Sequence, residues 1–249
     1  MRVTIPIPTD YAKLMIASTC HLGGQSLTHK MSEYAYSRRS DKVWVFDLQK
    51  TWDKLVLAAQ IIVSYKNRGD IVVVSSKKFG HKPATMFARA IGATPVTGNF
   101  VPGTFTNRST KAITEPRLII TTDPFTDKQT ICEASYINVP CISLANTDNQ
   151  IELIDCVIPC NNRSPPAIGA MFFILGQLVR YMEGSVELSD EIRLKADAYF
   201  YRDPSEIESA LAEAEKVQEE ENDSGYEEEE EETKWEEAPE GDEEDWAGK

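Results

Sequence analysis

The chain of 249 residues carries 40 acidic and 26 basic side chains, a formal net charge of −14, and 41% of its residues are hydrophobic. The acid is concentrated at one end, because residues 205–249 hold 21 of the acidic residues against three lysines. Residues 1–204 therefore carry a net charge of +4 and are long enough for one domain with a substantial core. So small a positive charge argues against a protein that is deeply buried in RNA. It is compatible with a protein that contacts a polyanion through one side of its surface.

The cysteines and apolar stretches indicate a soluble, intracellular protein. The cysteines are odd in number and form no C-x-x-C pair, so we expect free, buried thiols in a reducing compartment; they are Cys20, Cys132, Cys141, Cys156 and Cys160. The first residues lack the apolar core of a signal peptide. The longest apolar stretch, residues 167–182, is interrupted by glycine, glutamine and arginine, so no membrane span is expected.

The first third of the chain alternates helix-like and strand-like segments. A helix is predicted from about residue 10 to 20, before Gly23 and Gly24. Residues 42–48 predict a strand. Thr51 can then cap a helix whose apolar positions recur at helical spacing up to Val63, with Gly69 as its end.

The alternation continues to residue 183. Residues 71–75 are apolar on both faces, as in a buried parallel strand. The further segments are a helix over 83–91 stopped by Gly92, strands over 93–96, 118–122, 140–145 and 157–158, and helices over 126–138 and 165–183. Repeated strand–helix–strand units predict an α/β fold with a three-layer parallel sheet and helices on both faces, Rossmann-like in plan.

Two segments fall outside this pattern. Residues 98–111 form a long loop rich in glycine, threonine and asparagine, a candidate functional loop. Residues 205–249 form the acidic tail, with six consecutive glutamates at 227–232, and beyond about residue 221 their composition predicts disorder. We therefore divide the chain into an α/β domain over 1–204 and a tail over 205–249.

A parallel α/β sheet raises the question of a nucleotide site. Neither residues 47–51 nor residues 75–80 contain the glycine-rich loop that phosphate requires, so no nucleotide cofactor is expected. Asp47 and Asp123 follow strands and could face a ligand there, although capping the next helix suits them better. No paired His/Cys spacing indicates a metal, and no G-x-S-x-G indicates a nucleophile. The sequence therefore predicts no metal, no small-molecule substrate and no enzyme.

Cationic residues cluster at four places, often beside serine, threonine and asparagine, which also donate to phosphate oxygens. A solvated surface explains them equally well from composition alone. The candidate RNA-binding residues are Arg38, Arg39 and Lys42; Lys77, Lys78, His81, Lys82 and Arg89; Arg108 and Lys111; and Asn161, Asn162 and Arg163.

Several short segments together resemble one known family. They are residues 46–51 (FDLQKT), 100–107 (FVPGTFTN), 122–124 (TDP), 133–136 (EASY), 145–148 (ANTD), 158–162 (IPCNN) and 199–204 (YFYRDP), in the family's order. An acidic tail with embedded tryptophans, Trp235 and Trp246, is also similar. The chain thus resembles the ribosomal protein SA (laminin receptor precursor) family, the eukaryotic counterpart of the bacterial second small-subunit protein, over about residues 8–204.

The resemblance implies a structural protein of the small ribosomal subunit. It implies contacts with small-subunit rRNA and neighbouring ribosomal proteins, a role in late subunit assembly, and a cytoplasmic location with nuclear passage during assembly. The family offers no catalytic residues. Animal members carry two tryptophans where this chain has Phe172 and Phe173, a departure from the forms to which laminin binding is ascribed.

Three other interpretations compete with this one. A Rossmann-type enzyme would need the missing glycine loop, and an adhesion receptor would need a route to the membrane. A generic RNA-binding module would share the charge distribution but would not explain the ordered series of segments.

Overall fold

Five parallel strands form the central sheet of the computed structural model, which describes residues 5–109, 113–185 and 196–203. In spatial order the sheet is β4-β3-β5-β6-β7. The strands are β3 (Ile71–Ser75), β4 (Thr94–Thr97), β5 (Leu118–Thr121), β6 (Cys141–Ala145) and β7 (Cys156–Pro159). Every residue of β3, β5, β6 and β7 is buried, so both faces of the sheet need a covering layer.

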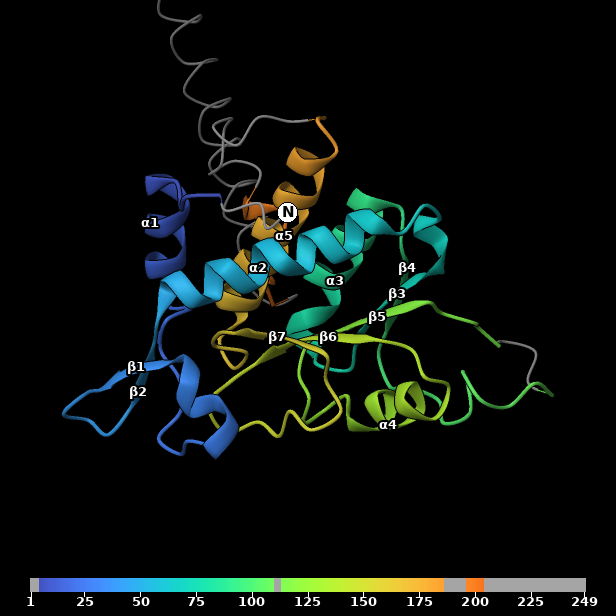
Figure 1. Cartoon of the computed structure of the whole chain (residues 1–249), viewed down its shortest axis with the longest axis horizontal. Helices are drawn as coiled ribbons and strands as arrows, with labels where there is room; N and C mark the ends of the chain where they lie inside the picture. The colour runs from blue at the N-terminus through green and yellow to red at the C-terminus, as the bar shows by residue number, and fades with distance from the viewer. Residues whose placement is uncertain (1–4, 110–112, 186–195, 204–249) are drawn as a thin grey trace, which may run out of the picture. The chain divides into compact units, whose positions relative to one another are not determined.

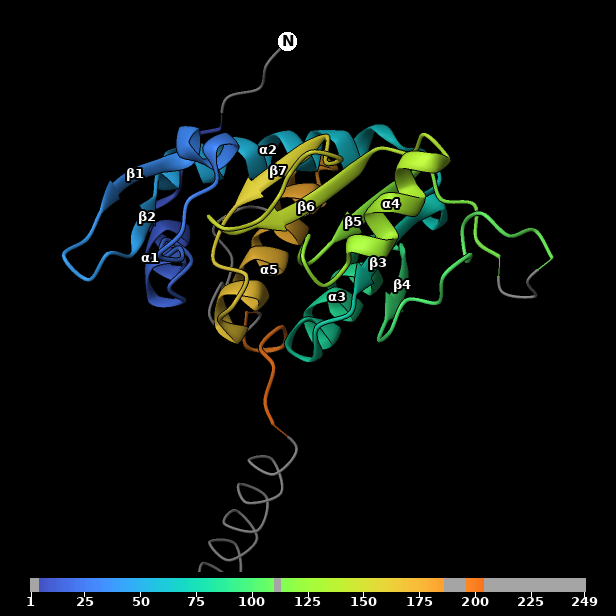
Figure 2. The ribbon, with the colours of Figure 1, turned by 90° about the horizontal axis from the view of Figure 1, so that it is seen from below.

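Helices supply that covering on both faces, which confirms the predicted three-layer α/β fold (Figures 1 and 2). One face carries α1 (Thr9–Ala17), α2 (Leu48–Ser64), α3 (Lys78–Ile91) and α5 (Pro165–Met182). The other face carries α4 (Lys128–Tyr136) and the 3-10 helix η1 (His29–Tyr34). A second 3-10 turn, η2 (Arg68–Asp70), precedes β3.

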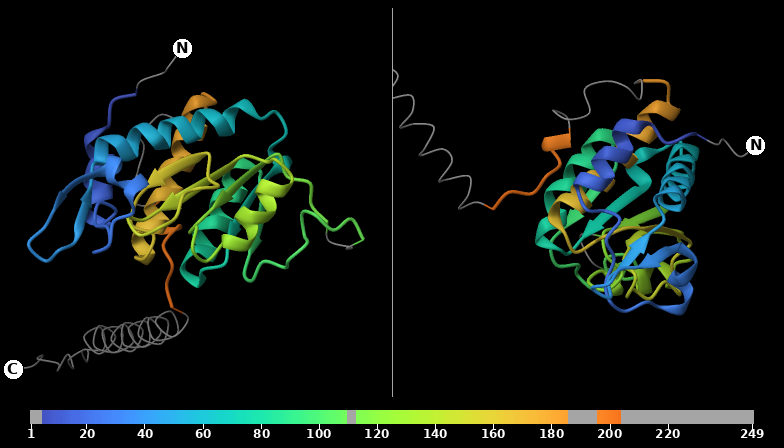
Figure 3. Two further views of the ribbon diagram at one scale, coloured as in Figure 1. Left: turned by 60° about the horizontal axis from the view of Figure 1, so that its bottom comes forward. Right: turned by 90° about the vertical axis from the view of Figure 1, so that its left-hand side faces the viewer.

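Helix α5 lies at the centre of the larger core. Phe172 and Phe173, the residues at the tryptophan positions of animal relatives, are 0% and 1% exposed. Phe172 packs against Phe87 of α3, with ring centroids 5.4 Å apart, and Phe173 packs edge-on against Tyr199 at 5.5 Å. Residues 196–201 therefore close over α5 (Figure 3). Among the described residues, no helix combines the length and apolarity needed to cross a bilayer.

The strand predicted over residues 42–48 exists but does not join the parallel sheet. β2 (Trp44–Phe46) pairs antiparallel with β1 (Ala35–Arg38), and the two form a separate hairpin. Its other edge binds the turn after α1, where Gly23 N donates to Trp44 O over 2.8 Å. β2 is only partly buried, unlike β3, β5, β6 and β7, because one side of the hairpin faces solvent.

Several predicted element ends also need correction. Asp47, and not Thr51, caps α2: its carboxylate accepts the Gln49 N–H over 3.0 Å. α2 ends at Ser64 rather than at Gly69. α3 starts at Lys78, before the predicted start at Pro83, and stops as expected at Gly92, whose φ of +77° suits glycine. The predicted tail over 205–249 lies outside the described residues.

Gly169 of α5 lies close to residues 199 and 200. We expect Gly169→Ala to lower the free energy of unfolding by about 1–3 kcal/mol. A Cβ atom there would lie 2.7 Å from the Phe200 ring and 3.0 Å from Tyr199 O. Gly176→Ala in the same helix is the matched control, because its nearest neighbour would be at an ordinary 3.5 Å. The control should be neutral or stabilising by up to ~1 kcal/mol. Urea unfolding of both variants measures the difference, and equal values would contradict the tight contact.

Candidate nucleic-acid interface

A buried polar network occupies the carboxyl ends of the parallel strands. Lys77 Nζ forms an ion pair with Asp123 Oδ2 at 2.6 Å and also donates to the carbonyl oxygen of Asn162 over 3.0 Å. The other oxygen of Asp123 accepts hydrogen bonds from the side-chain amides of Asn149 and Asn162 over 3.1 and 3.0 Å. Asp123 is 3% exposed, so this carboxylate is fully engaged by the protein itself.

This network fills the place where parallel α/β folds usually bind a ligand. The strand order reverses between β3 and β5, and such a switch point forms the ligand crevice of nucleotide-binding proteins of this plan. Here Lys77 follows β3 and Asp123 follows β5, and their ion pair joins the two strand ends. Asp123 therefore acts as an internal partner, and of the two aspartates only Asp47 caps a helix.

Asp127, the residue before α4, binds the same carboxyl ends of the strands. Its carboxylate accepts the backbone N–H groups of Ser76, Thr122 and Asp123 over 2.9, 3.2 and 3.2 Å. Burial raises the pKa of Asp127, while the hydrogen bonds with Ser76 act in the opposite direction. One side chain thus ties together the ends of β3 and β5 and the start of α4.

The segments that carry the family resemblance contact one another and their neighbours. Thr147 Oγ1 accepts the N–H of Gly24 over 2.8 Å, and Thr51 Oγ1 donates to Pro159 O over 2.9 Å. Glu133 accepts the N–H of Gly103, over 2.6 Å, in the loop after β4. Gly103 has a φ of +90°, which favours glycine. These contacts therefore help to hold the fold together.

A row of basic side chains runs along the exposed face of α3. Lys82 and Arg89 stand four and eleven residues after Lys78, so the three project from one side of the helix. We call these three residues the α3 stripe. Each is exposed, and none makes an ion pair or hydrogen bond within the described part of the chain. His81 is only partly exposed, and its Nε2 is buried without a partner among the described residues.

The β1–β2 hairpin carries a second basic group at its tip. The guanidinium of Arg38 lies 5.4 Å from the centre of the Trp44 ring, and its Nε donates to Lys42 O over 3.1 Å. Arg39 forms an ion pair with Asp41 at 3.1 Å, and both side chains are exposed to solvent. Lys42 is exposed at the turn, with a φ of +64°. The tip is thus pre-arranged and accessible to a large anionic partner.

The remaining candidates are more scattered. Arg108 is exposed in the loop after β4, whereas Lys111 lies outside the described residues. That loop and the hairpin lie at opposite ends of the sheet (Figures 1 and 2). Arg163 is exposed and paired with Asp148. Asn161 donates to Thr19 O over 3.2 Å, and Asn162 is buried in the network described above. The structure therefore joins two of the four predicted groups through the hydrogen bond between Lys77 and Asn162. The hairpin tip and the loop that carries Arg108 stay separate from them.

Sequence reasoning missed the stripe as a single surface. The helix predicted over 83–91 leaves Lys78 and Lys82 in a loop, because proline favours the first turn of a helix and so marks Pro83 as the start. The apolar spacing of Pro83, Phe87 and Ile91 places Lys78 and Lys82 on the polar side of a helix that starts earlier, and this signal could have found it. Among the described residues, no cluster of three or more His, Cys, Asp or Glu side chains could hold a metal ion.

The comparisons with known proteins agree with the segment matches. The family model described as ribosomal protein S2 matches residues 15–114 and 110–184. The chain belongs to the ribosomal protein S2 family. One relative is "Small ribosomal subunit protein uS2" of Enterocytozoon bieneusi (strain H348), 45% identical over 223 residues, which cover 90% of each chain.

Membership of the S2 family confirms the resemblance seen in the sequence and makes the chain a structural constituent of the small ribosomal subunit. A structural role also accounts for an α/β sheet whose ligand crevice is filled by the protein's own side chains. The outer surface of the chain carries the α3 stripe and the hairpin tip.

Proposed function

We propose that this protein binds small-subunit rRNA through exposed basic side chains, contacts neighbouring small-subunit proteins, and supports late subunit assembly and translation in the cytoplasm. Passage through the nucleus during assembly is part of the proposal. The observation that carries it is the S2-family relationship over 90% of the chain. The role is structural rather than catalytic.

The α3 stripe supports the RNA contact on physical grounds. Two of its lysines lie in the first two turns of α3, where the helix macrodipole is positive and cations are unfavourable. The side chain of the N-cap residue Lys77 accepts none of the first N–H groups of α3, one of which, that of Gly80, donates to Lys77 O over 3.0 Å. A phosphate placed there would meet both the ammonium groups and the helix end.

The hairpin tip supports a second contact. Arg38 and Lys42 stand on a narrow two-stranded ribbon that projects from the sheet, together with Tyr36, which is 77% exposed. A basic ribbon with an exposed aromatic ring suits RNA, because arginine and lysine neutralise phosphates while the ring offers a stacking surface. Two separate basic surfaces fit a protein that docks on RNA at its periphery.

Sedimentation of tagged full-length protein through a sucrose gradient tests the proposed function. We expect the protein to migrate with free small subunits and with whole ribosomes, and to leave them as the salt concentration rises, because phosphate contacts release counterions. Migration only as free protein at low salt would refute the proposal.

A further inference from the structure

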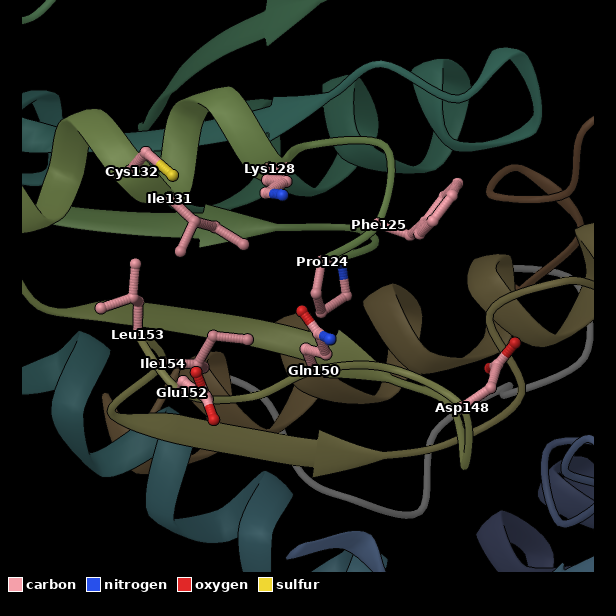
Figure 4. A pocket seen from close by; sticks show the side chains of 10 residues that line it. All are labelled: Pro124, Phe125, Lys128, Ile131, Cys132, Asp148, Gln150, Glu152, Leu153 and Ile154. Carbon is pink, nitrogen blue, oxygen red and sulfur yellow. The ribbon is translucent and has the colours of Figure 1, made fainter. Parts of the chain in front are cut away.

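A groove on the α4 face of the sheet has a different character from the basic surfaces. It has a volume of about 580 Å³ and lies between α4 and the connection from β6 to β7. Ile131 and Leu153 face each other across it, and Phe125 stands at one end (Figure 4). We call this the α4 groove.

Two apolar side chains of the groove are open to solvent, whereas Ile131 is 5% exposed. Phe125 is 82% exposed, the most exposed large hydrophobic side chain in the described part of the chain, and Leu153 is 50% exposed. Covering such a side chain is favourable, so its exposure in the free protein marks a surface that a partner can cover.

Phe125 is held in this position by the buried network. Its N–H donates to Asp123 Oδ1 over 3.1 Å, and Asp127 N donates to Asp123 O over 2.9 Å. The backbone of this turn is therefore fixed before any partner arrives. An aromatic side chain on a fixed backbone has few torsions left to lose on binding, which suits an interface anchor.

The charges of the groove select the kind of partner. Its lining includes Glu152, Lys128 and Asp148, and the Asp148 carboxylate already pairs with Arg163. Glu152 is 74% exposed, and its contact with Lys30, at 3.8 Å, is long for an ion pair. An RNA phosphate would face the Glu152 carboxylate at close range, whereas a basic side chain of a protein segment would neutralise it.

We propose that the α4 groove docks a basic, apolar-anchored segment of a neighbouring small-subunit protein. The inference rests on the proposed function, and it assigns the protein contact to the face of the sheet opposite α3. An apolar side chain of the partner fills the space between Ile131 and Leu153 beside Phe125, and a lysine or arginine meets Glu152.

Cys132 in the wall of the groove reports directly on its occupancy. The other four cysteines of the chain are buried, and burial raises the pKa of Cys20 and Cys141 to about 12, so Cys132 is the accessible thiol. Maleimide labelling of Cys132, followed by mass spectrometry, should be about tenfold or more slower in purified small subunits than in the free protein. An equal rate in the two states would overturn the proposal.

Photo-cross-linking identifies the occupant. Full-length protein with p-benzoyl-phenylalanine in place of Phe125 should cross-link, within purified subunits, to a peptide of another small-subunit protein that contains lysine or arginine. A cross-link to rRNA, or to a second copy of this chain, would overturn the proposal while leaving the ribosomal role intact. Absence of the protein from subunits would refute the proposed function itself, and this inference with it.

A substitution pair measures the contribution of the anchor. In cells that express tagged variant and untagged wild-type protein together, Phe125→Ala should be depleted from small subunits by up to roughly 30-fold relative to wild type, the effect expected for an interface anchor. Leu57→Ala removes another exposed apolar side chain, 41% exposed on α2, and should incorporate as wild type does. Equal incorporation of the two variants would count against the groove.

Discussion

Asp123→Ala is expected to lower the free energy of unfolding by about 3–5 kcal/mol, since it removes one partner of a buried ion pair. The Asp123 carboxylate is 4% exposed as a side chain and Lys77 is 20% exposed. Without Asp123, the Lys77 ammonium keeps a single carbonyl partner, and the amides of Asn149 and Asn162 each lose an acceptor in the interior. Urea unfolding, followed by circular dichroism, gives the change.

Asp41→Ala is the matched control. Asp41 also forms an ion pair, with Arg39 at 3.1 Å, but the two side chains are 59% and 60% exposed, so solvent screens the interaction. We expect a change of no more than ~1 kcal/mol. A double-mutant cycle with Lys77→Ala then isolates the coupling between Lys77 and Asp123. If Asp123→Ala and Asp41→Ala prove equally mild, the network does not stabilise the sheet edge as described.

Removing the α3 stripe is expected to have the largest effect on RNA binding. The triple variant Lys78→Ala, Lys82→Ala and Arg89→Ala should bind small-subunit rRNA with a log–log salt dependence less steep by about 2, at ~0.7–0.9 for each phosphate that is no longer neutralised. Binding by the full-length protein, measured at a series of salt concentrations, gives the slope. An unchanged slope would assign these residues to solvent.

Two controls separate this effect from a general reduction of charge or from unfolding. Lys128→Ala removes one exposed lysine from the opposite face of the sheet and should leave the salt dependence unchanged, in contrast to Lys82→Ala. Lys78→Ala also removes a cation from the positive end of α3, so the protein should be as stable as wild type or more stable by ~0.3–1 kcal/mol. Weaker binding together with unchanged or higher stability is the expected signature of a binding residue.

Lys77 shows why a basic side chain cannot be assigned from sequence. In the sequence Lys77 and Lys78 are equivalent neighbours, but Lys77 turns inward to Asp123 and Lys78 faces solvent. Their difference arises because α3 starts between them, so the two side chains point in different directions. A contact of Lys77 with RNA remains a prediction, and the exposed stripe is the sharper test.

The sequence by itself determined the layered α/β plan and the family. Apolar runs such as residues 71–75 and helical spacing such as that of Phe87 and Ile91 are local signals, and local signals fix element type. Gly92 likewise ends α3 as predicted, because a left-handed φ is a property of one residue. The ordered segments, read together, are enough to indicate the ribosomal relationship, since no knowledge of packing is needed to match them.

Only the tertiary structure decided which elements are neighbours and which side chains are available. Residues 44–46 form a strand in either context, but only the folded chain shows that they pair with residues 35–38 and not with a strand of the parallel sheet. Phenylalanine is usually a core residue, yet Phe125 is 82% exposed in the turn after β5, whose backbone is fixed by hydrogen bonds to Asp123 and Asp127. Burial and partnership depend on the whole fold, so the filled crevice, the α3 stripe and the α4 groove exist only in the folded chain.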